Sequence, residues 1–188
     1  VLFRSTGAVY LTFDDGPTPE QTGWILDNLR EYGAKATFFC LGQQAARHPE
    51  LIECIRSAGH SLGHHSYSHP NGWRTPTADY LPDIEKGAQQ IGSNLFRPPY
   101  GMLRPAQYRA LSKRYRIVGW SLMPGDYDHT ISSETCYQRV AGNIKAGDIV
   151  CLHDNVKSSE HLRACLPGWL KLFAEKGLSC QALPETGI

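Results

Sequence analysis

Long apolar runs and blocks of like charge are absent from this sequence. No stretch of 18 apolar residues occurs, so the sequence predicts no membrane-spanning helix. No five consecutive residues carry the same charge, and 19 basic against 18 acidic residues give a formal net charge of +1. The sequence therefore predicts neither a nucleic-acid-binding arm nor a basic membrane-surface patch, and charge alone indicates no partner.

The cysteine pattern excludes another class of site. No Cys-x-x-Cys pair occurs, which argues against a structural zinc site, and the wide spacing does not require disulfides. The cysteines are Cys40, Cys54, Cys136, Cys151, Cys165 and Cys180. We predict that Cys40 and Cys151, which lie in apolar runs, are small core residues. Val1–Ser5 lacks the ordered regions of a secretory signal.

Short β-prone runs alternate with helical patterns along the chain. The predicted strands are Ala8–Phe13, Ala36–Leu41, Ser61–His64, Leu95–Arg97, Arg116–Leu122, Asp148–His153 and Leu178–Ala182. The predicted helices cover about 18–33, 51–59, 77–92, 105–114, 133–145 and 158–176. This alternation with short connections is typical of an α/β protein with a parallel sheet.

Two helices carry sequence signals at specific positions. Thr18, Pro19 and Gln21 form the pattern of an N-cap, a proline in the first turn and a capping box. Gly33 fits the left-handed residue that ends such a helix. Pro167 lies inside the last helical pattern and predicts a kink or a break there.

Strand and helix periodicity fits either an open doubly wound sheet or a closed barrel. The polar motifs favour the barrel, because each lies at or just after the end of a predicted strand, where a barrel gathers its active-site loops on one face. No linker, low-complexity segment or internal repeat is visible, so we predict one domain over residues 1–188.

Two acidic residues and two histidines predict a metal-assisted hydrolase. Asp15, His65 and His69 make a three-ligand set for a divalent metal with one position left open. On a helical turn, His65 and His69 would point the same way. The neighbouring Asp14 is placed to accept a proton. Taken separately, the acidic motif also fits a turn, and the histidine pair also fits surface residues.

Three later segments carry further candidates. His153 ends an apolar strand and fits a general acid, or a histidine in a strand-end turn. In Arg97–Gly101, two prolines limit the conformational freedom of Arg97 and Tyr100. This rigidity suits a site that must orient a carboxylate and offer a backbone N–H to an oxyanion. It equally suits a stiff surface corner. Trp120–Asp128 offers an aromatic platform and a carboxylate for a pocket. Taken alone, the same segment also fits residues of the core and of a loop.

Together and in this order, these elements resemble the polysaccharide deacetylase family, the NodB-homology domain of carbohydrate esterase family 4. The resemblance extends from Leu11 to Asp154. It implies a distorted (β/α) barrel with about seven parallel strands. It also implies a divalent metal, usually zinc, although carboxylate and imidazole ligands accept cobalt or nickel as well.

The resemblance implies a role for each motif residue. The catalytic set is Asp14 as base, Arg97 as its tether, the Tyr100 N–H as oxyanion donor, His153 as acid and Asp126 as the carboxylate that orients it. The metal ligands are Asp15, His65 and His69, and Ser66 braces their loop. The substrate-binding set is Pro98, Tyr100, Trp120, Tyr127 and Leu152, with Leu152 lining the acetyl-methyl pocket.

Three positions depart from the family pattern. His64 stands where Asn is frequent and adds an imidazole that could compete for the metal. Tyr127 replaces the commoner Trp, and Met123 occupies a position that is often acidic. We expect these departures to affect the choice of substrate more than the chemistry.

The implied activity is metal-dependent release of acetate from N-acetylated glycans, such as peptidoglycan, chitin or chito-oligosaccharides. The alternatives are O-deacetylation of xylan, hydrolysis of a small amide or cyclic imide, and a glycan-binding module without turnover. The expected partner is thus an acetylated oligo- or polysaccharide rather than a nucleic acid. A cell-wall substrate would favour a location outside the cytoplasm.

Overall fold

The computed structural model describes residues 7–185, so the segment Val1–Ser5 lies outside the described part. The strands are β1 (Ala8–Asp14), β2 (Ala36–Cys40), β3 (Ser61–His64), β4 (Leu95–Phe96), β5 (Arg116–Ile117), β6 (Ile149–His153) and β7 (Ser179–Cys180). The helices are α1 (Pro19–Glu31), α2 (Gly42–Arg47), α3 (Pro49–Ser57), α4 (Thr77–Ile91), α5 (Pro105–Leu111), α6 (Ser133–Ala141) and α7 (Ser159–Glu175). Two short 3₁₀ turns are η1 (Pro99–Gly101) and η2 (Val156–Ser158). Within residues 7–185, every helix is too short or too polar to cross a membrane.

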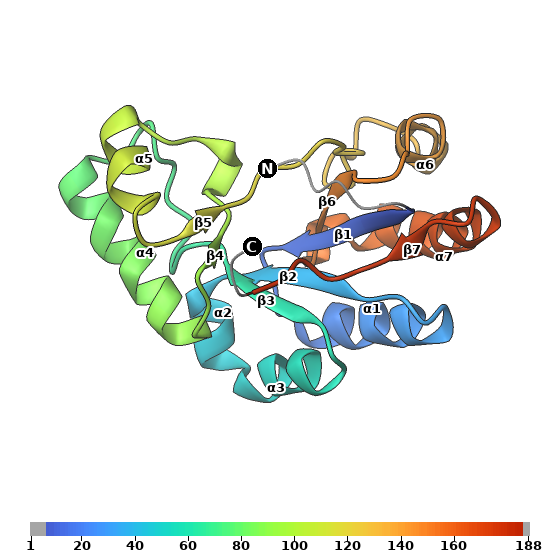
Figure 1. Cartoon of the computed structure of the whole chain (residues 1–188), viewed down its shortest axis with the longest axis horizontal. Helices are drawn as coiled ribbons and strands as arrows, with labels where there is room; N and C mark the ends of the chain where they lie inside the picture. The colour runs from blue at the N-terminus through green and yellow to red at the C-terminus, as the bar shows by residue number, and fades with distance from the viewer. Residues whose placement is uncertain (1–6, 186–188) are drawn as a thin grey trace.

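All the strands pair in parallel, in the order β5-β4-β3-β2-β1-β6, and β7 pairs with the first residues of β1 (Figure 1). Asp14 at the end of β1 is in register with His153 at the end of β6. Between β5 and β6, a single bridge from Leu122 to Val150 continues the sheet. The predicted distorted barrel of about seven parallel strands is therefore confirmed.

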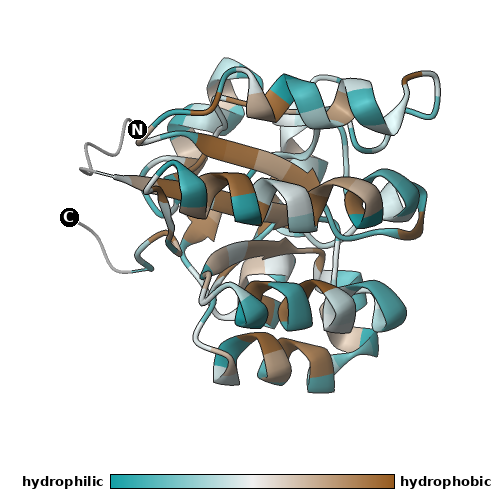
Figure 2. Ribbon diagram, turned by 90° about the vertical axis from the view of Figure 1, so that its right-hand side faces the viewer, coloured by the Kyte–Doolittle hydropathy of each residue, from teal (hydrophilic) through white to brown (hydrophobic). Residues whose placement is uncertain are grey.

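The main core lies between the strands and the helices that cover them, and Figure 2 shows largely apolar strands behind helices in which hydrophilic and apolar residues alternate. Val9, Leu11 and Phe13 belong to this core. Because successive side chains of a strand point to opposite faces, Thr12 and Asp14 face the interior of the barrel instead. The same alternation therefore places polar groups inside the barrel at the end of β1.

The strand predicted over Arg116–Leu122 is shorter in the structure. The chain pairs with β4 only through β5 and the N–H of Val118, which donates to Phe96. The N–H groups of Ser121 and Leu122 then donate to the carbonyl of Ile149. Residues 118–122 thus cross from β4 to β6, and this crossing replaces a full strand.

The N-terminus of α1 differs from the predicted capping box. The hydroxyl of Thr18 donates to the carbonyl of Asp154 at 2.8 Å and does not cap the helix. The Thr18 N–H instead donates to the hydroxyl of Thr22, also at 2.8 Å. The side chain of Gln21 is buried without a hydrogen-bond partner among the described residues. Tertiary contact with the chain after β6 has therefore replaced the local cap.

Pro167 does not break the last helix, and α7 runs from Ser159 to Glu175. The helix buries Leu166, Trp169 and Phe173 against the main core. This packing offsets the loss of the backbone hydrogen bond that a proline cannot make. The left-handed helix end predicted at Gly33 is confirmed by its φ of 61°.

Candidate active site

The predicted site residues come together at the C-terminal ends of the strands. Loops after β1, β3, β4 and β5, together with the end of β6, surround a cavity of about 540 Å³. The cavity is lined by Asp14, Asp15, His65, His69, Pro98, Tyr100, Met102, Trp120, Met123, Tyr127, His153, Asn155 and Lys157. Segments that are far apart in sequence thus present carboxylates, imidazoles and aromatic rings to one space.

Asp15, His65 and His69 lie close enough to share one cation. The Oδ1 atom of Asp15 is 3.8 Å from Nε2 of His65 and 3.4 Å from Nε2 of His69. That oxygen is buried and has no hydrogen-bond partner among the described residues. A buried carboxylate oxygen left without a partner is costly, and a divalent cation would satisfy it. The set therefore fits a metal such as zinc.

Neighbouring groups orient these ligands. The Nδ1 atom of His65 lies 2.8 Å from the carbonyl oxygen of Arg97, an acceptor that fixes the proton on Nδ1 and leaves the Nε2 lone pair facing Asp15. The side-chain amide of Asn155 donates to Oδ2 of Asp15 at 2.7 Å. Burial and the nearby His65 lower the pKa of His69. A neutral imidazole is the form that binds a metal.

The histidine loop is not the helical turn that the spacing predicted. Ser66 and His69 have φ angles of 72° and 64°, and the N–H of His69 donates to the hydroxyl of Ser66 at 2.9 Å. Asp83 on α4 accepts the N–H groups of Tyr67 and Ser68 at 3.0 and 3.2 Å. Left-handed residues therefore bring the two imidazoles together, with ring centroids 5.0 Å apart.

The helix α4 can approach this loop closely because Gly87 has no side chain. A Cβ atom at this position would lie 2.4 Å from the carbonyl carbon of Ser66, and that carbon belongs to the backbone. The close approach brings Asp83 within reach of the loop N–H groups. Gly87 therefore helps to hold the histidine loop in place.

Backbone strain concentrates around the cavity. Among residues 7–185, the non-glycine residues with positive φ are Asp15, Ser66, His69 and Tyr100. Left-handed backbone costs about 1–3 kcal/mol at such residues and persists where surrounding contacts over-determine it. Asp15, His69 and Tyr100 line the cavity, and the hydroxyl of Ser66 accepts the N–H of His69. The strain thus marks the same region as the ligand geometry.

Asp14 is held by a buried arginine. One terminal nitrogen of Arg97 donates to Oδ1 of Asp14 at 2.8 Å and to the hydroxyl of Thr12 at 2.7 Å. The other donates to the carbonyl of Gly119 at 3.0 Å. Burial acts to raise the pKa of Asp14, but the charge and hydrogen bond of Arg97, together with the nearby imidazoles of His65 and His153, outweigh it and hold the pKa below its ordinary value. Asp14 is thus a carboxylate at neutral pH.

Cys151 is buried, as predicted, whereas Leu152 does not lie where the resemblance places it. The thiol of Cys151 donates to Oδ2 of Asp14 at 3.3 Å, so this residue contacts the site rather than only filling the core. Burial raises the pKa of Cys151 and keeps the thiol protonated. Leu152 belongs to the main core and does not line the cavity. On β6, Cys151 and His153 share the inner face, so Leu152 points outward.

His153 is held by Asp126, which is fully buried. The Nδ1 atom of His153 lies 2.9 Å from Oδ1 of Asp126, and its backbone N–H donates to Oδ2 at 2.7 Å. Burial favours the neutral ring, but the hydrogen bond and charge of Asp126 outweigh it and raise the pKa of His153 to about 9. The imidazole is therefore protonated at neutral pH and can donate a proton.

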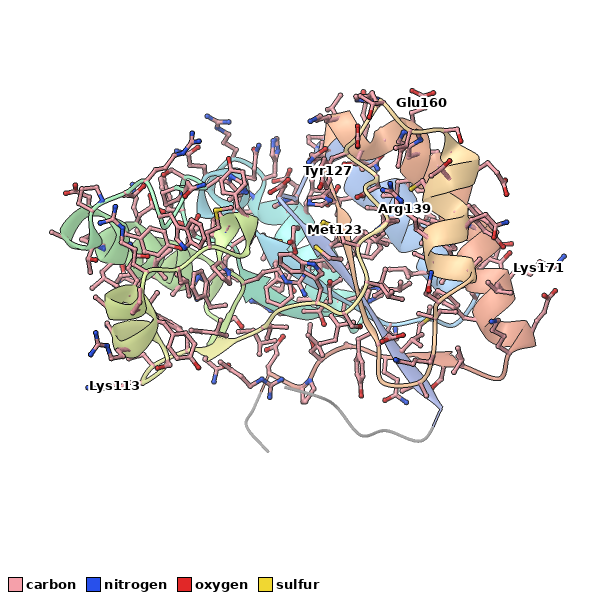
Figure 3. The ribbon with its side chains drawn as sticks, turned by 90° about the horizontal axis from the view of Figure 1, so that it is seen from above. Lys113, Met123, Tyr127, Arg139, Glu160 and Lys171 are labelled. Atoms are coloured by element: carbon pink, nitrogen blue, oxygen red, sulfur yellow. The ribbon has the colours of Figure 1, made fainter. Side chains whose placement is uncertain are left out.

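One wall of the cavity is largely aromatic. The ring of Tyr127 packs edge-on against His153 with centroids 5.0 Å apart, and its hydroxyl reaches the sulfur of Met123. In Figure 3, Met123 and Tyr127 lie close together between the central strands and helices α6 and α7. Trp120, Pro98 and Tyr100 complete this wall. These residues form a surface against which a neutral ring can pack.

His64 does not join the metal set. Its ring stacks on Phe96 and meets Tyr115 edge-on, each at 4.8 Å between centroids. Burial lowers the pKa of His64 to about 3. Because β3 alternates its side chains, His64 faces outward whereas His65 reaches the cavity. The expectation that His64 competes for the metal is therefore wrong.

The sequence did not predict that three further residues contact the site residues or the loop that carries them. Asn155 could have been found from the sequence, because it is a polar residue that follows His153 and Asp154 just after the end of a strand. Asn155 also accepts the N–H of Ser158 and caps η2. Asp83 and Cys151 carry no signal of this kind, because they act from a helix and from the middle of an apolar strand.

Comparison with known proteins finds one family by sequence and by structure. The polysaccharide deacetylase model matches residues 4–118. A peptidoglycan-N-acetylglucosamine deacetylase of Bacillus cereus is 36% identical over 187 residues, covering 94% of this chain and 67% of the relative. A chitooligosaccharide deacetylase of Azorhizobium caulinodans is 30% identical over 168 residues, covering 85% and 79%. The structure of the Bc1960 peptidoglycan N-acetylglucosamine deacetylase matches with a TM-score of 0.83 at 32% identity, covering 95% of this chain and 86% of that one.

Proposed function

Because the chain belongs to the polysaccharide deacetylase family, we propose that it releases acetate from N-acetylated glycans of the peptidoglycan or chito-oligosaccharide type. The observation that carries this proposal is the division of labour around one cavity. An open three-ligand set lies beside a carboxylate held by Arg97 and an imidazole held by Asp126. This combination suits hydrolysis of an amide, which needs a base for water and an acid for the leaving nitrogen.

Asp15, His65 and His69 would hold the metal. A divalent cation in that set supplies positive charge that polarises an acetyl carbonyl and makes a water molecule more acidic. We propose zinc, because one carboxylate and two imidazoles with an open position suit its catalytic sites, although cobalt and nickel accept the same donors. Asn155 keeps Oδ2 of Asp15 occupied, so Oδ1 is the oxygen offered to the cation.

The remaining residues move protons and orient the substrate. Asp14 accepts a proton from the attacking water, while Arg97 holds its carboxylate in place. His153 donates a proton to the departing sugar nitrogen, and Asp126 keeps the proton available on the ring. The Tyr100 N–H is proposed to stabilise the developing oxyanion. Pro98, Trp120 and Tyr127 would hold the sugar ring against the cavity wall.

Metal removal tests this function directly. We expect chelator-treated protein to release no acetate from chitotetraose, and added zinc to restore release, because the bound cation again supplies positive charge at the ligand set. His69→Ala should lose both metal binding and turnover, whereas His48→Ala, which removes an imidazole outside the ligand set at the N-cap of α3, should retain both. Acetylated xylan and a cyclic imide are assayed in parallel. Release from xylan alone, or turnover of the imide alone, would contradict N-deacetylation of glycans.

The pH profile tests the role of His153. Its pKa of about 9 predicts that kcat falls as the pH rises through that value, because the protonated ring is the donor. In Asp126→Asn the stabilising charge is lost, so the alkaline limb should move to lower pH by about 1–3 units. The measurement is kcat against pH at saturating metal. An alkaline limb that stays in place would refute the assignment of His153 as the acid.

A further inference from the structure

Asp154 is a buried carboxyl that the proposed mechanism does not use. It follows the proposed acid His153 directly, it is fully buried, and it does not line the cavity. Its Oδ1 atom has no hydrogen-bond partner among the described residues. Burial of such a polar atom lowers stability, so a carboxyl at this position calls for a role that offsets the loss.

Helix α1 and strand β1 hold this residue in place. The hydroxyl of Thr22, itself fully buried on α1, donates to Oδ2 of Asp154 at 2.5 Å. The hydroxyl of Thr18 donates to the Asp154 carbonyl at 2.8 Å. The Asp154 N–H donates to the carbonyl of Asp14 at 2.7 Å. Both the backbone and the side chain of Asp154 are therefore fixed.

The Asp154 carboxyl lies against the backbone of Gly16, the residue that follows the proposed ligand Asp15. A Cβ atom on Gly16 would lie 2.8 Å from Cγ of Asp154 and closer still to its Oδ2, so no side chain fits there. The carbonyl of Gly16 also accepts the N–H of Leu41 at 2.9 Å. Contacts with Asp154 and Leu41 thus fix the chain immediately after Asp15.

Asp15 depends on such support because of its backbone conformation. Its φ angle of 77° is left-handed, and a non-glycine residue keeps that conformation only where its surroundings enforce it. The conformation matters for the site, since Oδ1 of Asp15 must stay near Nε2 of His65 and His69. Asn155 holds the other carboxylate oxygen of Asp15, and its neighbour Asp154 holds the next backbone unit.

We propose that Asp154 is a positioning residue for the metal ligand Asp15. This inference rests on the metal set of the proposed function. Thr22 fixes the Asp154 carboxyl, and the carboxyl packs on Gly16 and keeps Asp15 in the left-handed conformation that presents Oδ1 to the cation. Metal affinity therefore depends on two side chains, Asp154 and Thr22, that lie outside the ligand set and do not line the cavity.

Zinc binding by the metal-free protein tests the proposal. The zinc Kd is measured by competition with a fluorescent chelator for wild type, Asp154→Ala, Thr22→Val and the double variant. Asp154→Ala should raise the Kd by about 10–100-fold, the usual effect of removing a residue that orients a metal ligand. Thr22→Val should act in the same direction. The double variant should bind no more weakly than Asp154→Ala, because both changes remove one shared contact.

Two comparison variants separate positioning from charge and from packing. Asp154→Asn keeps the shape and an oxygen that accepts the Thr22 hydroxyl, so its Kd should stay near that of wild type. Thr37→Val removes another fully buried hydroxyl, one that accepts the N–H of Leu183, and should leave the Kd unchanged. A loss in Asp154→Asn equal to that in Asp154→Ala would mean that charge acts, and would overturn the proposal. An equal loss in Thr37→Val would overturn it in favour of general packing.

The outcomes also separate this inference from the function on which it rests. Unfolding in urea shows whether each metal-free variant is folded, and if Asp154→Ala is not, the Kd of Thr22→Val decides. Tight zinc binding by wild type with an unchanged Kd in the folded variant would refute the role of Asp154 and leave the proposed function intact. Wild type that binds zinc no more tightly than His69→Ala would contradict the metal set, and with it both proposals.

Discussion

Replacement of Asp14 by Asn is expected to lower kcat for acetate release by about 10²–10⁴-fold, the usual contribution of a positioned base. The amide oxygen can still accept the hydrogen bond from Arg97, so the geometry should survive, but the amide cannot take a proton from water. Asp15, His65 and His69 are unchanged, and the metal content should therefore equal that of wild type. The measurements are kcat at saturating substrate and bound zinc per chain.

Two comparisons make this result specific to Asp14. Asp27→Asn changes a surface carboxylate whose side chain is 65% exposed in an ion pair with Arg30, and it should leave kcat unchanged. A thermal melt of Asp14→Asn distinguishes lost chemistry from lost folding, because the substitution leaves the buried Arg97 without its anionic partner. Near-normal kcat in a folded, metal-loaded Asp14→Asn protein would exclude Asp14 as the base.

The sequence predicted the site well where strands deliver side chains directly. Asp14 ends β1 and His153 ends β6, and their register in the parallel sheet brings the two together. A strand that ends in a polar residue carries this information locally, because the C-terminal ends of parallel strands meet at one edge. The barrel and the assembly of the polar motifs could be predicted for this reason.

Loop conformation and tertiary contact could not be predicted in the same way. The spacing of His65 and His69 suggested a helical turn, but contact with Asp83 and the left-handed Ser66 produce the convergence instead. The contact of Cys151 with Asp14 joins residues 137 positions apart in sequence. The family resemblance places Leu152 in the cavity, but its neighbours on β6 occupy the inner face, so the period of the strand excludes it.

Replacement of Arg97 by Met is expected to lower the free energy of unfolding of the metal-free protein by about 3–5 kcal/mol, because it leaves a buried carboxylate without its partner. Arg97 is fully buried and also donates to Thr12 and to the Gly119 carbonyl, so these acceptors lose a donor as well. Urea unfolding at pH 7 measures the loss. The double variant Arg97→Met with Asp14→Asn should recover part of it, because the uncompensated charge is then gone.

The sign of the pH dependence distinguishes this mechanism from a simple packing defect. In wild type the lowered pKa of Asp14 contributes stability above its ordinary value of 3.8, and this contribution is lost as the pH falls. Without Arg97, burial dominates and raises the pKa of Asp14, so the carboxylate destabilises the folded variant at neutral pH and protonation relieves it. The difference in unfolding free energy between wild type and Arg97→Met should therefore shrink as the pH falls from 7 toward 4. A difference that does not change with pH would mean that Arg97 stabilises the barrel by packing and hydrogen bonds rather than through Asp14.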